Sequence, residues 1–188
     1  MREVELKAVV DDLAERRRTI EAAGATIVFE GRLSDRRYDR ASGELSGRDE
    51  VLRVRRYQNA TVAKTTLDWK GPTEVRDVYK VREEINTGID DFDSLQQILA
   101  RLGFELISEI DREIAQYRFG EATVRFESYP RMDNLVEIEG EPAAIESAIE
   151  ALGMPRGTFS SDRLAAFVAR FEQRTGVKAA ICDTELRN

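Results

Sequence analysis

The chain has 188 residues, of which 41% are hydrophobic, so it is long enough for one domain with a substantial core and short for two independent ones. It contains no histidine and a single cysteine, Cys182, which excludes Cys/His zinc sites, Ser-His-Asp nucleophile systems and an intrachain disulfide. Any metal must therefore be held by oxygen, and the net charge of −7 opposes non-specific attraction to nucleic acid or to an anionic membrane.

No apolar run approaches the roughly 20 residues that a membrane helix needs, and the opening segment MREVELKAVVDDLAERRR lacks the apolar stretch of a secretion signal. We therefore expect a cytoplasmic protein. The patterns described below extend to about residue 175, so we expect a single domain over residues 1–175 and a loose C-terminal tail over residues 176–188.

Eight segments alternate apolar and polar residues with the period of a β-strand. In chain order, these predicted strands are residues 3–10, 25–33, 51–57, 61–70, 78–85, 104–110, 122–128 and 135–140. Four segments carry apolar residues at helical spacing, and three of them end at a glycine, as helices often do. These predicted helices are residues 11–23, 93–102, 142–152 and 160–174, and loops are expected at residues 39–50, 71–77 and 129–134.

The order of strand, helix, glycine and further strands occurs near the start of the chain and again around residues 80–126. This repetition is compatible with two similar halves that close an antiparallel sheet into a barrel, with helices packed outside. The predicted fold class is therefore α+β.

The predicted strands have one apolar face and one ionic face. At residues 51–57, for example, Leu52 and Val54 alternate with Arg53 and Arg55. The ordinary interpretation is an antiparallel sheet with its apolar face on the core and its ionic face in water. However, like charges two residues apart on one face repel each other unless opposite charges lie between the strands, which favours a closed barrel with the ionic face inside.

The charges inside such a barrel would need partners. Carboxylates in one sector would bind metal cations, and guanidinium and ammonium groups in another sector would bind a polyanion bridged to those metals. A triphosphate meets both requirements, because it carries several negative charges and chelates Mg²⁺ through its oxygens.

Six short motifs lie on or beside the predicted strands. They are EVELK at residues 3–7, VLRVRR at 51–56, LDWKGP at 67–72, KVREEI at 80–85, VRFE at 124–127 and VEIEG at 136–140. In residue type and order they resemble the motifs of the CYTH superfamily of triphosphate tunnel metalloenzymes, which includes class IV adenylyl cyclases, thiamine triphosphatases and inorganic triphosphatases. The resemblance runs from residue 3 to about residue 175, and it implies a closed antiparallel tunnel of about eight strands.

The resemblance also implies roles for individual side chains. The acidic residues implied as ligands of Mg²⁺ or Mn²⁺ are Glu3, Glu5, Glu127, Glu137 and Glu139. The basic residues implied in catalysis are Lys7, Arg55, Lys70, Arg82 and Arg112. The same five are expected to bind the triphosphate, together with Arg53, Lys80 and Arg125.

Three departures from the family pattern bear on the leaving-group and nucleotide contacts more than on the metal site. Ile114 stands where the family has the second of two basic residues, and Asp68 replaces the usual threonine in the LDWKGP motif. The segment SYPRMDN at residues 128–134 replaces an acidic, glycine-containing turn of the cyclases. Lys80 also has an ordinary alternative, which is to pair with Glu84 on the same face.

Three functions remain open at this point. Hydrolysis of a triphosphate is favoured slightly, and without histidine a carboxylate or the metal site must accept the proton. Cyclisation of ATP is favoured by LDWKGP and disfavoured by the changed turn. The retained carboxylates argue against a non-catalytic polyphosphate- or nucleotide-binding module. The expected partner is a small-molecule triphosphate (ATP, thiamine triphosphate or tripolyphosphate) rather than nucleic acid or a membrane, and a homodimer is left open.

Overall fold

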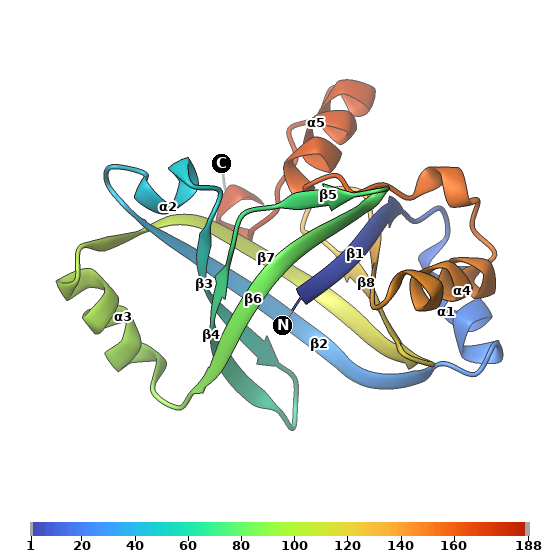
Figure 1. Cartoon of the computed structure of the whole chain (residues 1–188), viewed down its shortest axis with the longest axis horizontal. Coiled ribbons are helices and arrows are strands. Elements are labelled where there is room, and N and C mark those ends of the chain that lie inside the picture. Colours follow the sequence, from blue (N-terminus) through green and yellow to red (C-terminus); the bar gives the residue numbers. More distant parts are fainter. Residues whose placement is uncertain (1, 187–188) are drawn as a thin grey trace.

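Strands and helices account for most of residues 2–186, the part of the chain that the computed structural model describes (Figure 1). The strands are β1 (Arg2–Val9), β2 (Thr26–Arg40), β3 (Val51–Gln58), β4 (Ala63–Lys70), β5 (Glu74–Arg76), β6 (Tyr79–Ile89), β7 (Phe104–Phe119), β8 (Ala122–Ser128) and β9 (Leu135–Glu139). The α-helices are α1 (Leu13–Ala22), α2 (Glu44–Gly47), α3 (Phe92–Arg101), α4 (Pro142–Leu152) and α5 (Leu164–Thr175). Two short 3₁₀ helices are η1 (Arg156–Thr158) and η2 (Asp183–Leu186).

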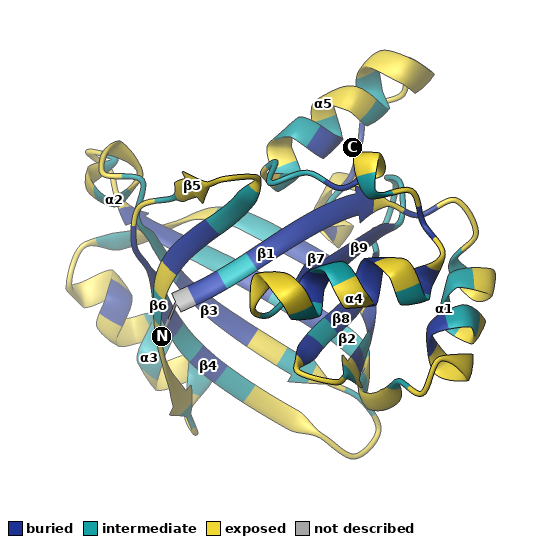
Figure 2. Cartoon of the chain, turned by 45° about the vertical axis from the view of Figure 1, so that its right-hand side comes forward, coloured by how far each residue is buried: buried dark blue, intermediate teal, exposed yellow. Residues whose placement is uncertain are grey.

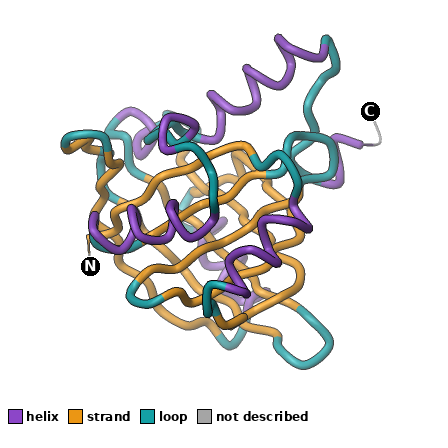
Figure 3. The backbone as a smooth tube through the Cα atoms, turned by 90° about the vertical axis from the view of Figure 1, so that its right-hand side faces the viewer, coloured by secondary structure: helices purple, strands orange, loops and turns teal. Residues whose placement is uncertain are grey.

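The strands form one antiparallel sheet in the order β1-β9-β8-β7-β2-β3-β4-β6-β5. β1 also pairs with β6, which closes eight strands into a barrel and leaves β5 as an additional strand at the edge of β6. The helices lie outside the strands (Figure 3). The predicted α+β fold, a closed eight-stranded antiparallel barrel with helices packed outside, is confirmed.

β2 and β7 are far longer than the sequence pattern predicted. They have 15 and 16 residues and pair from Thr26 opposite Arg118 to Arg40 opposite Phe104, whereas the predicted strands ended at residues 33 and 110. Charged residues interrupt the apolar alternation in the added parts. Pairing between the two strands satisfies their backbone groups there, and this long-range effect is not visible in either segment alone.

Two segments predicted as loops contain regular structure, and one predicted helix starts late. α2 lies within residues 39–50, where Asp39 accepts hydrogen bonds from the backbone of Leu45 and Ser46 at 2.9 and 2.8 Å. β5 lies within residues 71–77 and is too short for its period to be recognised. α5 begins at residue 164 rather than 160, because Ser160 forms a backbone β-bridge with Lys7.

The main apolar core lies between the outer face of the barrel and helices α1 and α4 (Figure 2). Ile145, Ile149 and Leu152 of α4 and Ile20 of α1 are buried there. They pack against outward-facing residues of four strands, which are Leu6, Ala8, Ala115, Tyr117, Val124, Phe126, Val136 and Ile138. Each large side chain buried in this way contributes roughly 1.5–3 kcal/mol. Because the apolar face points outward to the helices, the ionic face points into the barrel, and the interpretation of a solvated ionic face is wrong.

The segment after residue 175, predicted as a loose tail, packs against the barrel over its described part. Ala180 is fully buried and forms a β-bridge with Arg131. The backbone amide of Asp111 in β7 donates to the carbonyl of Ile181 at 2.8 Å. Within residues 2–186, no helix has the length and apolar character that crossing a membrane requires.

Candidate active site

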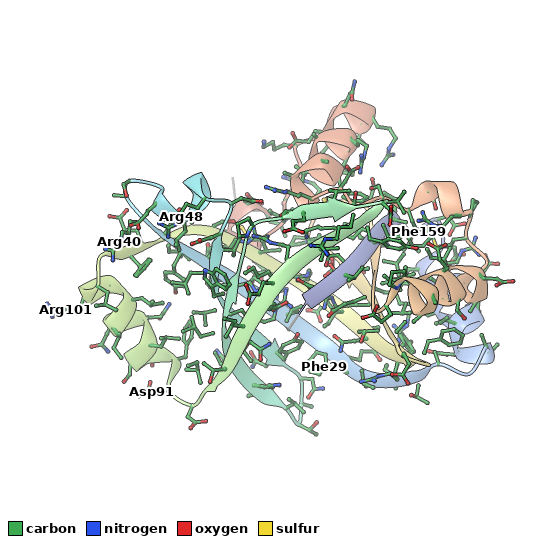
Figure 4. The ribbon with its side chains drawn as sticks, viewed as in Figure 1. Phe29, Arg40, Arg48, Asp91, Arg101 and Phe159 are labelled. Atoms are coloured by element: carbon green, nitrogen blue, oxygen red, sulfur yellow. The ribbon has the colours of Figure 1, made fainter. Side chains whose placement is uncertain are left out.

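The barrel interior is lined by ionisable side chains from all eight of its strands, because each strand directs every second residue inward. Side chains fill the space between the ribbons in Figure 4, whereas the labelled Arg40, Arg48 and Arg101 lie at the periphery. The buried interior residues, each at most 9% exposed, are Glu3, Glu5, Lys7, Asp35, Arg53, Arg55, Asp68, Lys70, Arg82, Arg112, Arg125, Glu127 and Glu137. Unpaired charges in such a place would be strongly destabilising, so their partners decide the character of the site.

These side chains enclose a cavity of about 80 Å³. Every predicted site residue except Glu139 lines it, so the structure brings together side chains from β1, β3, β4, β6, β7, β8 and β9 that are distant in sequence. A larger cavity of about 570 Å³ lies outside the barrel, beside β4 and the start of α3, and none of the predicted site residues lines it. The chemistry is concentrated in the smaller cavity.

On the β1 side of the cavity, Glu5 joins two lysines. Its Oε1 lies 2.9 Å from Lys7 Nζ and 2.5 Å from Lys80 Nζ. Lys80 therefore pairs across strands with Glu5, whereas Glu84 was the partner considered from sequence. Lys7 also contacts Glu137. Burial lowers the pKa of Lys7, but the neighbouring carboxylates, Glu137 foremost, outweigh burial and raise it above its ordinary value, so this lysine stays charged.

Lys70 and Arg53 are held by acidic residues from three strands. Lys70 Nζ lies 2.5 Å from Glu3 Oε2 and 3.0 Å from Glu84 Oε2. Arg53 donates to Asp68 Oδ2 from Nε at 2.9 Å and from Nη2 at 2.6 Å. Asp68, which departs from the family pattern, thus neutralises a predicted phosphate ligand of this chain.

Asp35 of β2 is the central acid of the basic side, and it was not among the predicted site residues. It accepts two hydrogen bonds from Arg55, Nε to Oδ1 at 2.7 Å and Nη2 to Oδ2 at 2.9 Å. Arg112 and Arg53 approach the same carboxylate at 3.2 and 3.6 Å. Burial alone would raise the pKa of Asp35, but the three guanidinium groups hold it well below its ordinary value. In the register with β3, Asp35 and Arg37 continue the inward positions of β2 past residue 33, but charges on both faces of this segment hide that alternation in the sequence.

Glu127 is saturated by donors. Its Oε1 accepts from Arg112 Nε at 2.9 Å and from Arg125 Nε at 3.1 Å, and its Oε2 accepts from Tyr129 Oη at 2.7 Å. Arg125 also contacts Glu137. Burial and the charge of Glu127 raise the pKa of Tyr129 well above its ordinary value, so this phenol remains a donor. Tyr129 was not predicted as a site residue because it follows β8, in a segment that reads only as a loop.

Arg82 closes one end of the cavity. Its guanidinium donates to the carbonyl oxygens of Gly71 at 2.6 Å and Asp49 at 2.7 Å. The Asp49 carboxylate in turn lies 2.6 Å from Arg163, just before α5. Leu164, the first residue of α5, also lines the cavity, so this is the α5 end of the barrel.

Glu139 differs from the other predicted residues because it has no hydrogen-bond or ion-pair partner among the described side chains. Burial, followed by the charges of Glu3, Glu137 and Glu5, raises its pKa to about 7. Glu5 and Glu139 are direct cross-strand neighbours of β1 and β9, so like charges face each other there. Arg125 offsets these charges only in part, so negative charge predominates at this point.

The acidic residues of β1 and β9 fit a hard divalent cation by their chemistry, since they offer only oxygen and carry surplus negative charge at Glu139. As placed, no three acidic side chains of the described chain are close enough together to hold one metal ion. Glu3, Glu5 and Glu137 are each drawn toward a lysine or arginine instead. Metal binding at this place requires these carboxylates to exchange ammonium and guanidinium partners for the ion.

The opposite end of the barrel opens into a second cavity of about 180 Å³. Glu3, Arg55 and Arg125 line both cavities, so both reach the same charged interior. The second cavity is otherwise lined by neutral and acidic side chains, namely Tyr57, Glu84, Asn86, Gln116, Thr123 and Glu139. Tyr57 packs edge-to-face on Phe29, with ring centroids 5.3 Å apart, so it has the packing role expected of an aromatic residue at a rim.

Comparison with known proteins agrees with this arrangement. The family model of the CYTH domain matches residues 1–152. No protein of curated function matches the sequence at a significant level.

Several solved structures share the fold. A candidate adenylate cyclase from Vibrio parahaemolyticus has a TM-score of 0.75 at 20% identity, covering 89% of this chain and 97% of that one. The PH1819 protein from Pyrococcus horikoshii OT3 has a TM-score of 0.71 at 23% identity, covering 89% and 98%. HpAC1 from Hippeastrum, a candidate adenylyl cyclase described as having a dominant triphosphatase activity, has a TM-score of 0.62 at 15% identity, covering 89% and 96%.

Proposed function

Since this chain belongs to the CYTH domain family, we propose that it is an enzyme that hydrolyses an organic or inorganic triphosphate inside its barrel with a divalent metal ion. The observation that carries the proposal is the division of the buried interior into two sectors. Carboxylates gather on β1 and β9, and guanidinium groups gather on β3, β7 and β8. A metal–triphosphate complex offers a cation to the first sector and oxyanions to the second.

The basic sector would bind and orient the phosphates. Arg55, Arg112 and Arg125 are held at fixed positions by Asp35 and Glu127. Guanidinium groups positioned in this way can donate to phosphate oxygens without reorganising when charge develops on the transferring phosphoryl group. Asp35 and Glu127 thus act here as the groups that position the arginines.

The acidic sector would hold the metal. Glu3, Glu5, Glu137 and Glu139 are the candidate ligands, and Glu139 is the one without a competing basic partner among the described residues. A divalent cation bound there would supply Lewis-acid polarisation of phosphate oxygen and a more acidic water. Glu127, also predicted as a ligand, has its oxygens occupied by Arg112, Arg125 and Tyr129, so the structure supports it less as a ligand.

The second candidate function is cyclisation of ATP to cyclic AMP and pyrophosphate. One observation favours it: the cavity opposite α5 carries Tyr57, Asn86 and Gln116, and the side-chain Oε1 of Gln116 is buried without a hydrogen-bond donor. An amino group on a heterocyclic base could supply that donor. Hydrolysis remains the first proposal because Ile114 stands where the family pattern has a second basic residue.

The test is an analysis of products. Purified full-length protein would be incubated with tripolyphosphate, thiamine triphosphate and ATP, each with Mg²⁺, with Mn²⁺ or with EDTA. We expect phosphate release from at least one triphosphate with metal, and none in EDTA. Cyclic AMP with pyrophosphate would establish the second candidate. Binding without any product would reduce the protein to a binding module, and full turnover in EDTA would contradict the role given to the metal.

A further inference from the structure

Arg37 of β2 lines the barrel cavity and, among the described residues, has no hydrogen-bond or ion-pair partner. Its Nε atom is buried with no acceptor. The other arginines of the cavity all donate to carboxylate or carbonyl oxygens, as Arg55 does to Asp35. Arg37 is therefore a charged donor inside the site for which residues 2–186 supply no acceptor.

The surroundings of Arg37 make this a costly arrangement. Arg37 lies directly opposite Arg53 in the pairing of β2 with β3. Burial, followed by the charge of Arg53, lowers the pKa of Arg37 to about 10, with Arg112 and Arg55 adding to the effect and Asp35 opposing it. A buried donor left unpaired costs about 1–3 kcal/mol, and more when it is charged. An anion placed beside Arg37 would remove this cost.

The position of Arg37 along the barrel indicates which part of a ligand it would meet. On β2 it is one inward position beyond Asp35, about 6.5–7 Å nearer the α5 end. Near that end the cavity is lined by Val51, Arg82 and Leu164, and the carboxylate of Asp49 there is paired with Arg163. The opposite end carries Glu3, Glu84 and Glu139 beside Arg55 and Arg125, so acidic side chains outnumber basic ones and phosphate is less favoured there. A phosphate chain that begins at the central arginines is thus directed toward Arg37.

We propose that Arg37 binds the phosphate of the substrate that lies farthest toward α5, so that it selects chains of three phosphates over chains of two. This inference rests on the proposed function, because it assumes that the barrel binds a polyphosphate. A two-phosphate chain is satisfied by the central arginines, whereas the third phosphate needs the donor that Arg37 leaves open. Among the described residues, no acceptor occupies the Nε–H group of Arg37, so this group is available to the third phosphate.

The experiment compares binding of tripolyphosphate and pyrophosphate by isothermal titration calorimetry in EDTA, which prevents turnover. The variants are Arg37→Gln, Arg37→Lys, Arg55→Gln and Arg56→Gln, the last a control that removes an exposed arginine from β3. We expect Arg37→Gln to weaken tripolyphosphate binding at least about 10-fold, as loss of a charge-assisted hydrogen bond does, and pyrophosphate binding less than about 3-fold. Arg37→Lys should recover part of the loss, and Arg56→Gln should change neither.

A thermal melt of the empty protein separates this role from a structural one. Arg37→Gln should melt at the wild-type temperature or above, because it removes an uncompensated charge. Equal weakening of both ligands, unchanged tripolyphosphate binding, or a lower melting temperature with unchanged binding would each overturn the inference. If Arg55→Gln loses tripolyphosphate while Arg37→Gln does not, only this inference fails. If the wild-type protein binds no tripolyphosphate in EDTA or with Mg²⁺, the proposed function fails with it.

Discussion

Asp35, which is fully buried, and Glu139, which is partly buried, have opposite surroundings in the same barrel. Asp35 faces three guanidinium groups, and its pKa lies well below the ordinary value. Glu139 faces other carboxylates, and its pKa is raised to about 7. The first carboxylate is compensated by the chain itself, whereas the second is compensated only in part, by Arg125, and would be stabilised by a cation from outside the chain.

The contrast distinguishes structural charges from ligand-binding charges inside one cavity. A buried ion pair with good geometry stabilises the fold only marginally, but breaking it is strongly destabilising, because one charge is left without a partner. An uncompensated group such as Glu139 or Arg37 destabilises the empty protein and is relieved by a ligand of the opposite sign. Replacing the two kinds of residue should therefore change stability in opposite directions.

The largest expected effect is the loss of stability when Asp35, the carboxylate that balances three arginines, is replaced. Asp35→Asn leaves Arg53, Arg55 and Arg112 without their shared carboxylate, so the free energy of unfolding should fall by about 3–5 kcal/mol. Urea denaturation of the ligand-free protein measures this change. The matched variant Glu139→Gln removes a carboxylate that has no basic partner in the described structure, and it should leave stability at pH 7 unchanged or higher. A loss below about 1 kcal/mol in Asp35→Asn would contradict the contrast.

Asp35 also shows which inward-facing residues could not be predicted from the sequence. The inward placement of Glu3, Glu5 and Lys7 could be predicted, because period-2 alternation in EVELKAVV assigns each residue to a face. Asp35 lies in SDRRYDR, where charges fall on both faces and no alternation is visible. Only pairing with β7 makes that segment a strand.

The partners of each charge were beyond prediction for the same reason. The alternation of VRFE places Glu127 inside, but it cannot show that Arg112, Arg125 and Tyr129 take up its oxygens. Those contacts depend on the register between β7 and β8 and on the path of the chain after β8. Sequence thus predicted which residues line the site better than it predicted what each of them does.

The second prediction concerns how the stability of the protein depends on pH through Glu139. The pKa of Glu139 is about 7 in the folded state, whereas its ordinary value is 4.5. Between these two pH values the folded protein keeps Glu139 protonated while the unfolded chain does not, so the free energy of unfolding falls as pH rises from about 4.5 to about 7. The difference corresponds to about 3 kcal/mol at most. Urea denaturation in EDTA at pH 5 and pH 8 should show this loss relative to Glu139→Gln.

The control for that measurement is Glu121→Gln, which removes an exposed carboxylate and should retain the wild-type pH dependence. Mg²⁺ should reduce the difference between the wild-type protein and Glu139→Gln at pH 8, because a bound cation favours the ionised carboxylate. If Mg²⁺ leaves that difference unchanged, the acidic sector does not bind the ion through Glu139.

A smaller effect is expected for ligand binding by the compensated arginines. Arg55→Gln should weaken tripolyphosphate binding by about 1.5–3 kcal/mol, the range for a hydrogen bond to a charged group. Arg56→Gln, the neighbouring residue on the exposed face of β3, is the matched control and should change binding by no more than about 1 kcal/mol. Calorimetric titrations of the two variants measure the difference. Equal affinities would show that the arginines of β3 serve only to balance Asp35.

The smallest expected effect decides between the two roles considered for Glu127. Tyr129→Phe removes one donor at 2.7 Å from Glu127 Oε2 but leaves the guanidinium donors on Oε1, so stability should fall by about 1 kcal/mol. If Glu127 positions Arg112 and Arg125, the Mg²⁺ concentration that gives half-maximal activity should not change, because the freed oxygen remains within the basic sector. If Glu127 is a metal ligand, removing a competing donor from Oε2 makes that oxygen more available, and less Mg²⁺ should be needed. Titrating activity with Mg²⁺ in Tyr129→Phe and in the wild-type protein therefore shows whether Glu127, like Asp35, only balances arginines or also binds the metal ion.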